Sequence, residues 1–306
     1  MYIQGGKFIM KKLALLLAAL GVVSAAAYAA PELTVTSVGQ EIEIENEDHN
    51  GTDLDDVWLF NNVGLAYGDW SFGLQAGKQW GVNFDDGDNG KEKGVKSEDS
   101  RLQIDVWKKV TDDLKLGFRY RGHKNYDRYY ARWDYSHGMF WSSGDVWYEA
   151  TNGSGLTKMT DKVDWVKSEF FPIGLKYGAF KVGYFINYNK AVGSMEESQQ
   201  EDYFEHQIRA YATLYKGEKV TLTTEGRFTI SAENGYNGAD AADYRHYDDF
   251  GRNRIYLGLD YQATENLKTY IKYGYEFRDW KVEGKDANDH KANAYQDFIV
   301  GWSYKF

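Results

Sequence analysis

Hydrophobic and polar residues alternate at every second position through most of this sequence. A period of two is typical of β-strands whose two faces meet different surroundings. The alternation predicts twelve strands clearly, at Leu33–Glu45, Val57–Tyr67, Trp70–Val82, Arg101–Val110, Leu114–Arg121, Val163–Tyr177, Phe180–Tyr188, Phe204–Leu214, Val220–Ile230, Arg252–Tyr261, Leu267–Arg278 and Phe298–Phe306.

Residues 124–160 are harder to interpret. They hold either one more hairpin, from Tyr126–Tyr135 and Asp145–Ala150, or two long strands that project above a membrane with an aromatic-rich loop between them. The strand count is then 12 or 14, and both numbers are even, as in bacterial single-chain barrels.

The connections between the predicted strands alternate between short and long. The turns near residues 68, 112, 178, 217 and 265 are short, whereas the segments near 49, 90, 194, 240 and 286 are long and polar. Short turns on one side and long loops on the other are typical of outer-membrane barrels. Because a bilayer cannot satisfy open strand edges, such a sheet must close. The sequence therefore predicts an all-β fold, a closed antiparallel transmembrane β-barrel, with a soluble β-sandwich as the alternative.

The last predicted strand has a large apolar face that continues to the final residue. Such an ending is typical of the closing strand of an outer-membrane barrel, and its other edge is expected to pair with the strand near Leu33. The alternative is a core strand of a soluble β-protein. We interpret the apolar face as the signal read by the barrel-assembly machinery, with periplasmic chaperones as further partners; its residues are Phe298, Val300, Trp302, Tyr304 and Phe306.

The N-terminus has the pattern of a secretory signal peptide. Met10-Lys11-Lys12 supplies the positive charge, Leu13–Val23 is apolar, and Ala27-Tyr28-Ala29 places small residues before a cleavage site. Residues 10–29 are thus predicted to be a signal peptide and 30–306 the barrel. Residues 1–9 are interpreted as a mis-annotated leader in front of the true start at Met10.

Composition and charge exclude several classes of protein. The chain has no Cys among its 306 residues, which excludes disulfides and thiolate metal sites. Its net charge of −10 argues against nucleic-acid binding. The mean hydropathy is −0.63, which excludes a helical membrane protein. Aromatic residues make up 17% of the chain and there are only 2 Pro, which suits long, regular strands.

The face opposite the apolar stripe is strongly basic, with acids and glycines among the basic residues. Charges at this density need water or ionic partners, so we expect an aqueous lumen. The predicted pore-lining residues are Arg101, Asp105, Arg119, Arg121, Glu205, Arg209, Glu225, Arg227, Arg252, Arg254, Asp260, Lys272, Glu276 and Arg278. The remaining acids gather in the long loops, where they are either solvated or bind divalent cations and lipopolysaccharide.

No motif points to catalysis or to a cofactor. The six His residues lie mostly in or near predicted loops, and none pairs with a Ser in a recognisable motif. Phosphate loops, dinucleotide fingerprints and His-based metal motifs are absent from the sequence. We therefore predict no enzyme, no catalytic residue, no metal and no cofactor.

Three segments resemble the monomeric porin family of outer-membrane protein G, among the general porins of Gram-negative bacteria. They are Gln207-Ile208-Arg209-Ala210-Tyr211, the run Asp249–Arg254, and the ending Gly301–Phe306. The resemblance is best over about the last hundred residues, and residues 124–160 depart from the family's pattern. It implies a 14-stranded monomeric barrel with a pore lined by Arg and acids, in which the lumenal arginines correspond most closely to Arg209, Arg252 and Arg254.

The function expected from the sequence is that of a porin in the bacterial outer membrane. Small hydrophilic solutes and ions would diffuse passively through a water-filled lumen with basic and acidic walls. The expected partners are these solutes, outer-membrane lipid and lipopolysaccharide. No part of the apolar stripe is less lipid-like than the rest, as a trimer contact would require, so a monomer is expected. The alternative is a structural or adhesive barrel whose lumen is blocked by residues 124–160 and whose extracellular loops bind ligands.

Overall fold

The computed structural model describes residues 31–46, 54–84, 94–151, 163–193, 200–236, 245–247, 249–278, 281–282 and 295–306. The predicted leader, the signal peptide and most of the acidic loops lie outside these ranges. Among the described residues, no helix is long and apolar enough to span a membrane.

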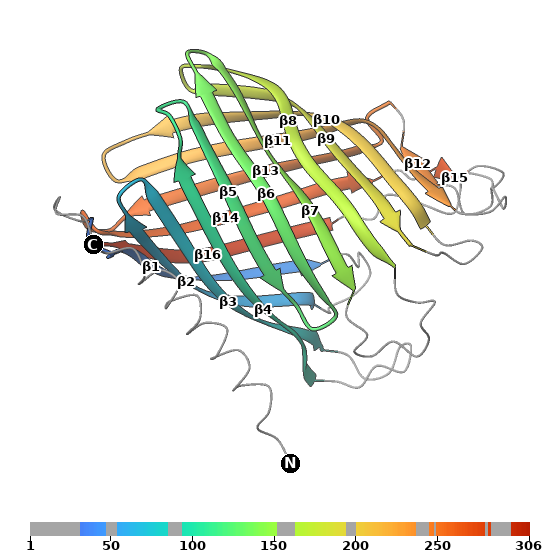
Figure 1. The fold of residues 1–306 in the computed structure, drawn as a ribbon, viewed down its shortest axis with the longest axis horizontal. Helices are drawn as coiled ribbons and strands as arrows, with labels where there is room; N and C mark the ends of the chain where they lie inside the picture. The colour runs from blue at the N-terminus through green and yellow to red at the C-terminus, as the bar shows by residue number, and fades with distance from the viewer. Residues whose placement is uncertain are drawn as a thin grey trace. The chain divides into compact units, whose positions relative to one another are not determined.

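Residues Thr34–Phe306 form one unit built from a single antiparallel sheet (Figure 1). Its long strands are β1 Thr34–Asn46, β2 Leu54–Tyr67, β3 Trp70–Asn83, β4 Gly94–Lys109, β5 Leu114–Gly122, β6 Tyr126–His137, β7 Phe140–Thr151, β8 Asp164–Tyr177, β9 Phe180–Val192, β10 Gln200–Lys216, β11 Val220–Tyr236, β13 Arg252–Gln262, β14 Leu267–Arg278 and β16 Tyr295–Lys305. Two short strands, β12 Arg245–Tyr247 and β15 Lys281–Val282, extend one edge beyond β11.

The sheet closes on itself. Each long strand pairs with the next one along the chain, and β16 pairs with β1 in a register that places Val300 opposite Ile42. This confirms the predicted barrel and the predicted pairing of the last strand with the first. The twelve clearly predicted strands are all present, and the wall has 14 long strands.

The two strands that raise the count from 12 to 14 come from residues 124–160, for which the sequence allowed two interpretations. Strands β6 and β7 form a hairpin within the wall, with His137 paired to Phe140 across a two-residue turn. The interpretation as strands that project above the membrane is therefore wrong. Gly138 in the turn has φ 56°, a left-handed conformation that glycine adopts without steric cost.

Short turns lie at the end of the barrel that also holds the C-terminus, which we call the turn end (Figure 1). Two further turns, at Gly68 and Gly178, repeat the two-residue form with φ of 56° and 57°. The backbone N–H of Lys305 donates to the carbonyl of Asn266, which ties the last strand to the β13–β14 turn. At the opposite end, the loop end, residues 123–125 make a short connection between β5 and β6.

The two faces of the wall are the reverse of those in a water-soluble protein. Large apolar side chains point outward and are exposed, for example Phe180 at 67% and Leu257 at 56%. Polar side chains point inward and are buried, such as Glu276 at 2% and Thr229 at 0%. An apolar exterior around a charged interior suits a wall that stands in lipid and encloses water.

A β-bulge changes the face of the residues in the middle of β8. The register with β9 shifts between Phe170 and Ile173, and Phe171 points inward, with its ring centroid 4.7 Å from that of Trp141 and 5.1 Å from that of Phe185. Strict alternation along the predicted strand Val163–Tyr177 would place Phe171 on the apolar stripe with Ile173. That expectation is wrong, because a bulge inserts one residue and reverses the alternation.

Some lumenal glycines make room for large rings. A Cβ at Gly174 would lie 2.0 Å from the Trp141 ring, and one at Gly183 would lie 2.6 Å from the same ring. These two glycines therefore leave no open space in the lumen, because the indole ring of Trp141 occupies it.

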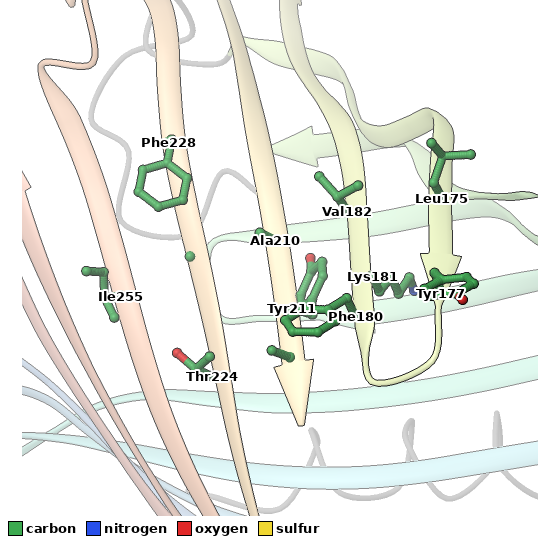
Figure 2. A pocket seen from close by; sticks show the side chains of 12 residues that line it. Leu175, Tyr177, Phe180, Lys181, Val182, Ala210, Tyr211, Thr224, Phe228 and Ile255 are labelled. Atoms are coloured by element: carbon green, nitrogen blue, oxygen red, sulfur yellow. The ribbon is translucent and has the colours of Figure 1, made fainter. Parts of the chain in front are cut away.

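The outer wall has a shallow hollow of about 420 Å³ over β8–β11 and β13 (Figure 2). The small residues Ala210, Ala212 and Gly226 form its floor, and larger apolar side chains such as Val182 and Phe228 form its rim.

Candidate functional site: the polar lumen

The fourteen side chains predicted to line a pore come from β4, β5, β10, β11, β13 and β14. They lie at alternate positions opposite the exposed apolar residues, and most contact one another across the strands. The contacts divide them into arginines paired with carboxylates and arginines held by neutral amides.

Glu276 gathers three arginines around one carboxylate. The Nε–H groups of Arg254 and Arg252 donate to its two oxygens at 2.6 and 3.1 Å, and Arg278 donates as well. Arg252 also approaches Glu205 at 3.3 Å. The described residues of this cluster are three arginines and two glutamates, and Glu276 is the acceptor that all three arginines share.

A second ion-pair network crosses β4 to β7. Asp105 accepts from Arg119 at 2.6 Å and from Arg132 at 2.5 Å, while Asp145 accepts from Arg132 at 2.6 Å. On the far wall, Arg227 and Lys272 both contact Glu225, at 2.6 and 3.2 Å. At the turn end Asp260 pairs with Lys268 at 3.3 Å.

Three arginines have only neutral partners. Arg101 donates from Nε and Nη2 to Gln75 at 3.1 and 2.7 Å, Arg121 donates from Nε to Gln103 at 2.7 Å, and Arg209 does the same to Gln207 at 2.7 Å. Within the described part of the chain none of the three forms an ion pair, so their charge is not neutralised locally.

Aromatic rings help to hold these guanidinium groups. Arg209 Cζ lies 3.2 Å from the centroid of Phe185, and Arg101 Cζ lies 4.0 Å from that of Phe60. Stacking of this kind fixes the plane of the cation without removing its charge. The predicted lining residues include no aromatic side chain, yet six aromatic residues are buried in the structure: Trp58, Phe60, Tyr130, Trp147, Tyr256 and Tyr295.

The strands that close the barrel carry acids on their inward face. Tyr270 donates to Glu41 at 2.8 Å, Tyr295 donates to Glu45 at 2.5 Å, and the hydroxyl of Tyr256 donates to Asp297 at 2.8 Å. Among the described residues, Glu41, Glu45 and Asp297 form no ion pair.

Glu41 and Glu45 were not included among the predicted lining residues. The sequence could have shown that they face inward, since Glu41, Glu43 and Glu45 alternate with Ile42 and Ile44. Because isoleucine faces lipid, the three glutamates must face the lumen.

The histidines that the structure describes in full have partners of their own. His123 Nδ1 lies 2.8 Å from Asp99, and burial lowers the pKa of His123 although this contact opposes the shift. His206 lies 2.9 Å from the Tyr184 hydroxyl and 2.8 Å from that of Ser231. Among the described residues, no group of three or more His, Asp or Glu could hold a metal ion.

Comparison with known proteins places this fold among outer-membrane β-barrels. A chain titled "Bacterial polysaccharide outer membrane secretin" superposes with a TM-score of 0.53 at 8% identity, covering 89% of this chain and 98% of that one. OmpT, an outer membrane protein of Vibrio cholerae, gives 0.44 at 15% identity over 92% of this chain and 100% of its own.

A third similar structure is the outer membrane channel DcaP of Acinetobacter baumannii, with a TM-score of 0.43 at 10% identity over 93% of this chain and 100% of that one. At such low identity, structural likeness shows the fold alone. No family model and no curated protein matches the sequence.

Proposed function

We propose that this protein is a porin of the bacterial outer membrane, through which small hydrophilic solutes and ions diffuse passively. The observation that carries the proposal is the reversed wall, with exposed apolar residues outside and unneutralised charges inside a closed barrel. A lumen that contains arginines and glutamates without ionic partners is stable only when water fills it. The chain needs no catalytic group for this function.

The fourteen predicted lining residues, together with the acids of β1 and β16, would form the walls of this pore. The plug suggested for residues 124–160 loses its basis for 126–151, because these residues belong to the wall as β6 and β7. Residues 152–160 lie outside the described residues. Lipopolysaccharide, lipid, periplasmic chaperones and the barrel-assembly machinery remain proposed partners.

The resemblance to outer-membrane protein G agrees with the 14 long strands of the barrel. We extend the proposal to a monomer of that type, in which each chain is a complete pore. Chemical crosslinking in native membranes tests this, and a specific trimer band would contradict it.

The porin proposal is tested by recording current across a planar lipid bilayer that contains the refolded protein. We expect stepwise increases in conductance. Because the chain has no Cys, single cysteines can show that the current runs through the lumen. At Gly73, which faces Asp105, an added Cβ would lie 3.4 Å from the Asp105 side chain, so there is room for a small residue.

We expect a charged, water-soluble thiol reagent to lower the conductance of Gly73→Cys. Its matched control is Leu74→Cys, the neighbouring residue on the lipid face, which should not respond. The absence of conductance steps under any condition would refute the porin proposal, and an equal response of both variants would show that the faces are wrongly assigned.

A further inference from the structure

Three arginines on adjacent strands line one cavity at the loop end of the lumen. Arg101 lies on β4, Arg121 on β5 and Arg128 on β6, and the last two are directly opposite each other in the β5–β6 register. Like charges at directly opposed positions destabilise a sheet. A wall that places three cations together therefore needs a counter-charge.

Among the residues that the structure describes, an ion pair supplies this counter-charge for only one of the three arginines. Arg128 pairs with Glu149. Arg101 and Arg121 are held by the side-chain oxygens of Gln75 and Gln103, and no other described residue accepts a hydrogen bond from either guanidinium group. Glutamine in these positions orients a guanidinium group as a carboxylate would, but leaves its positive charge for another partner.

The rest of the cavity is polar and its acids already accept from neutral donors. It has a volume of about 460 Å³, within the range of small-molecule sites. Gln79 donates to Asp56, and Tyr295 donates to Glu45 at 2.5 Å. Carboxylates in such surroundings accept hydroxyl groups readily, and they repel ligands with a second negative charge.

We propose that this cavity binds a sugar acid, a polyhydroxylated molecule with a single carboxylate, as it enters the pore. The inference rests on the proposed porin function. The carboxylate of the ligand pairs with Arg101 and Arg121, and its hydroxyl groups donate to Asp56 and Glu45. A neutral sugar lacks the charge that the guanidinium pair requires, and phosphate has only one or two P–OH donors near neutral pH and carries additional charge.

Binding can be measured without any conductance. Calorimetric titration of the refolded barrel in detergent with glucuronate should show saturable binding, at least tenfold tighter than with glucose, phosphate or alanine. Equal affinity for glucuronate and glucose, or tighter binding of phosphate or zwitterionic alanine, would overturn the proposal.

Two variants localise the site. The double variant R101Q/R121Q removes the charge and should weaken glucuronate binding at least tenfold. In Gln75→Glu the new carboxylate pairs with Arg101 from within the wall, so it should weaken binding similarly without lowering the urea midpoint of unfolding, since the Asn62 amide can rotate to donate to it. The control Lys108→Gln removes one charge outside the lumen, beside Asp69, and should bind as wild type.

The outcomes separate this proposal from the porin proposal. Wild-type affinity in both R101Q/R121Q and Gln75→Glu would refute the site even if the barrel conducts. A barrel that binds glucuronate through these arginines but shows no conductance would support the site and refute the porin.

Discussion

The Glu276 cluster gives the sharpest test of how the lumen is held together. Glu276→Gln keeps the shape of the side chain but removes its charge and one acceptor oxygen. Three Nε–H groups, from Arg252, Arg254 and Arg278, now donate to this carboxylate, and a glutamine oxygen can replace only part of that. Each charge-assisted hydrogen bond contributes about 1.5–3 kcal/mol. Two lost contacts therefore correspond to about 3–6 kcal/mol, with three guanidinium groups left near each other.

Water in the lumen lowers this loss of free energy, because the side chains of Arg252 and Arg254 are 22% and 11% exposed and can form hydrogen bonds with water. We therefore expect Glu276→Gln to lower the free energy of unfolding by about 3 kcal/mol, the lower end of this range. The assay is reversible urea unfolding in lipid vesicles, followed by tryptophan fluorescence, with mobility on unheated gels as a check of folding.

The matched control is Glu41→Gln, which makes the same chemical change at a lumenal carboxylate whose hydrogen bond comes from the Tyr270 hydroxyl. Glu41→Gln should lower the free energy of unfolding by less than about 1.5 kcal/mol. If both variants lose the same free energy, or if Glu276→Gln loses less than about 1 kcal/mol, then the cluster does not depend on this carboxylate and the reasoning is refuted.

Three further changes test other parts of the structure. Replacing Arg209, Arg252 and Arg254 with Ala should shift the reversal potential toward cation selectivity. Arg209→Ala alone should give the largest single effect, because its partner Gln207 is neutral. Unchanged reversal potentials would show that these arginines do not set the selectivity of the pore. Deleting Phe306 should lower the amount of assembled barrel in membranes while the conductance of each channel stays the same, and wild-type amounts would contradict the assembly signal. Gly174→Val should cost about 1–3 kcal/mol in urea unfolding, since its Cβ would overlap Trp141, whereas an unchanged midpoint would show that the indole moves freely.

The alternation of residues predicted the strands because lipid and water demand opposite side chains at successive positions. This argument fails where the two faces are alike. In β6, the outward Tyr129 and the inward Tyr130 are both aromatic, and the inward face also carries Arg128 and Arg132. The segment thus lacked the contrast on which the prediction rests, although its hairpin is as regular as the others.

The prediction of the site was limited for a different reason. Spacing shows that Arg254 and Arg209 face inward, but it does not show their partners. Arg254 contacts Glu276 from the neighbouring strand, whereas Arg209 contacts Gln207 from its own strand. Only the register of the strands and the positions of the side chains distinguish an arginine that is neutralised from one that is not.

Neutral partners keep some of the lumenal charges separate, beside the direct ion pairs of Glu276 and Asp105. Arg101 and Arg209 are oriented by glutamines, and Glu41, Glu45 and Asp297 by tyrosine hydroxyls. In a dry core, opposite charges would pair directly, because the cost of burying each one alone is several kcal/mol. Here water lowers that cost, and neutral partners hold each side chain without cancelling its charge. The β4–β5 part of the wall therefore keeps positive charge and the nearby β1–β16 part keeps negative charge, and a solute that passes these strands experiences the electric field between them.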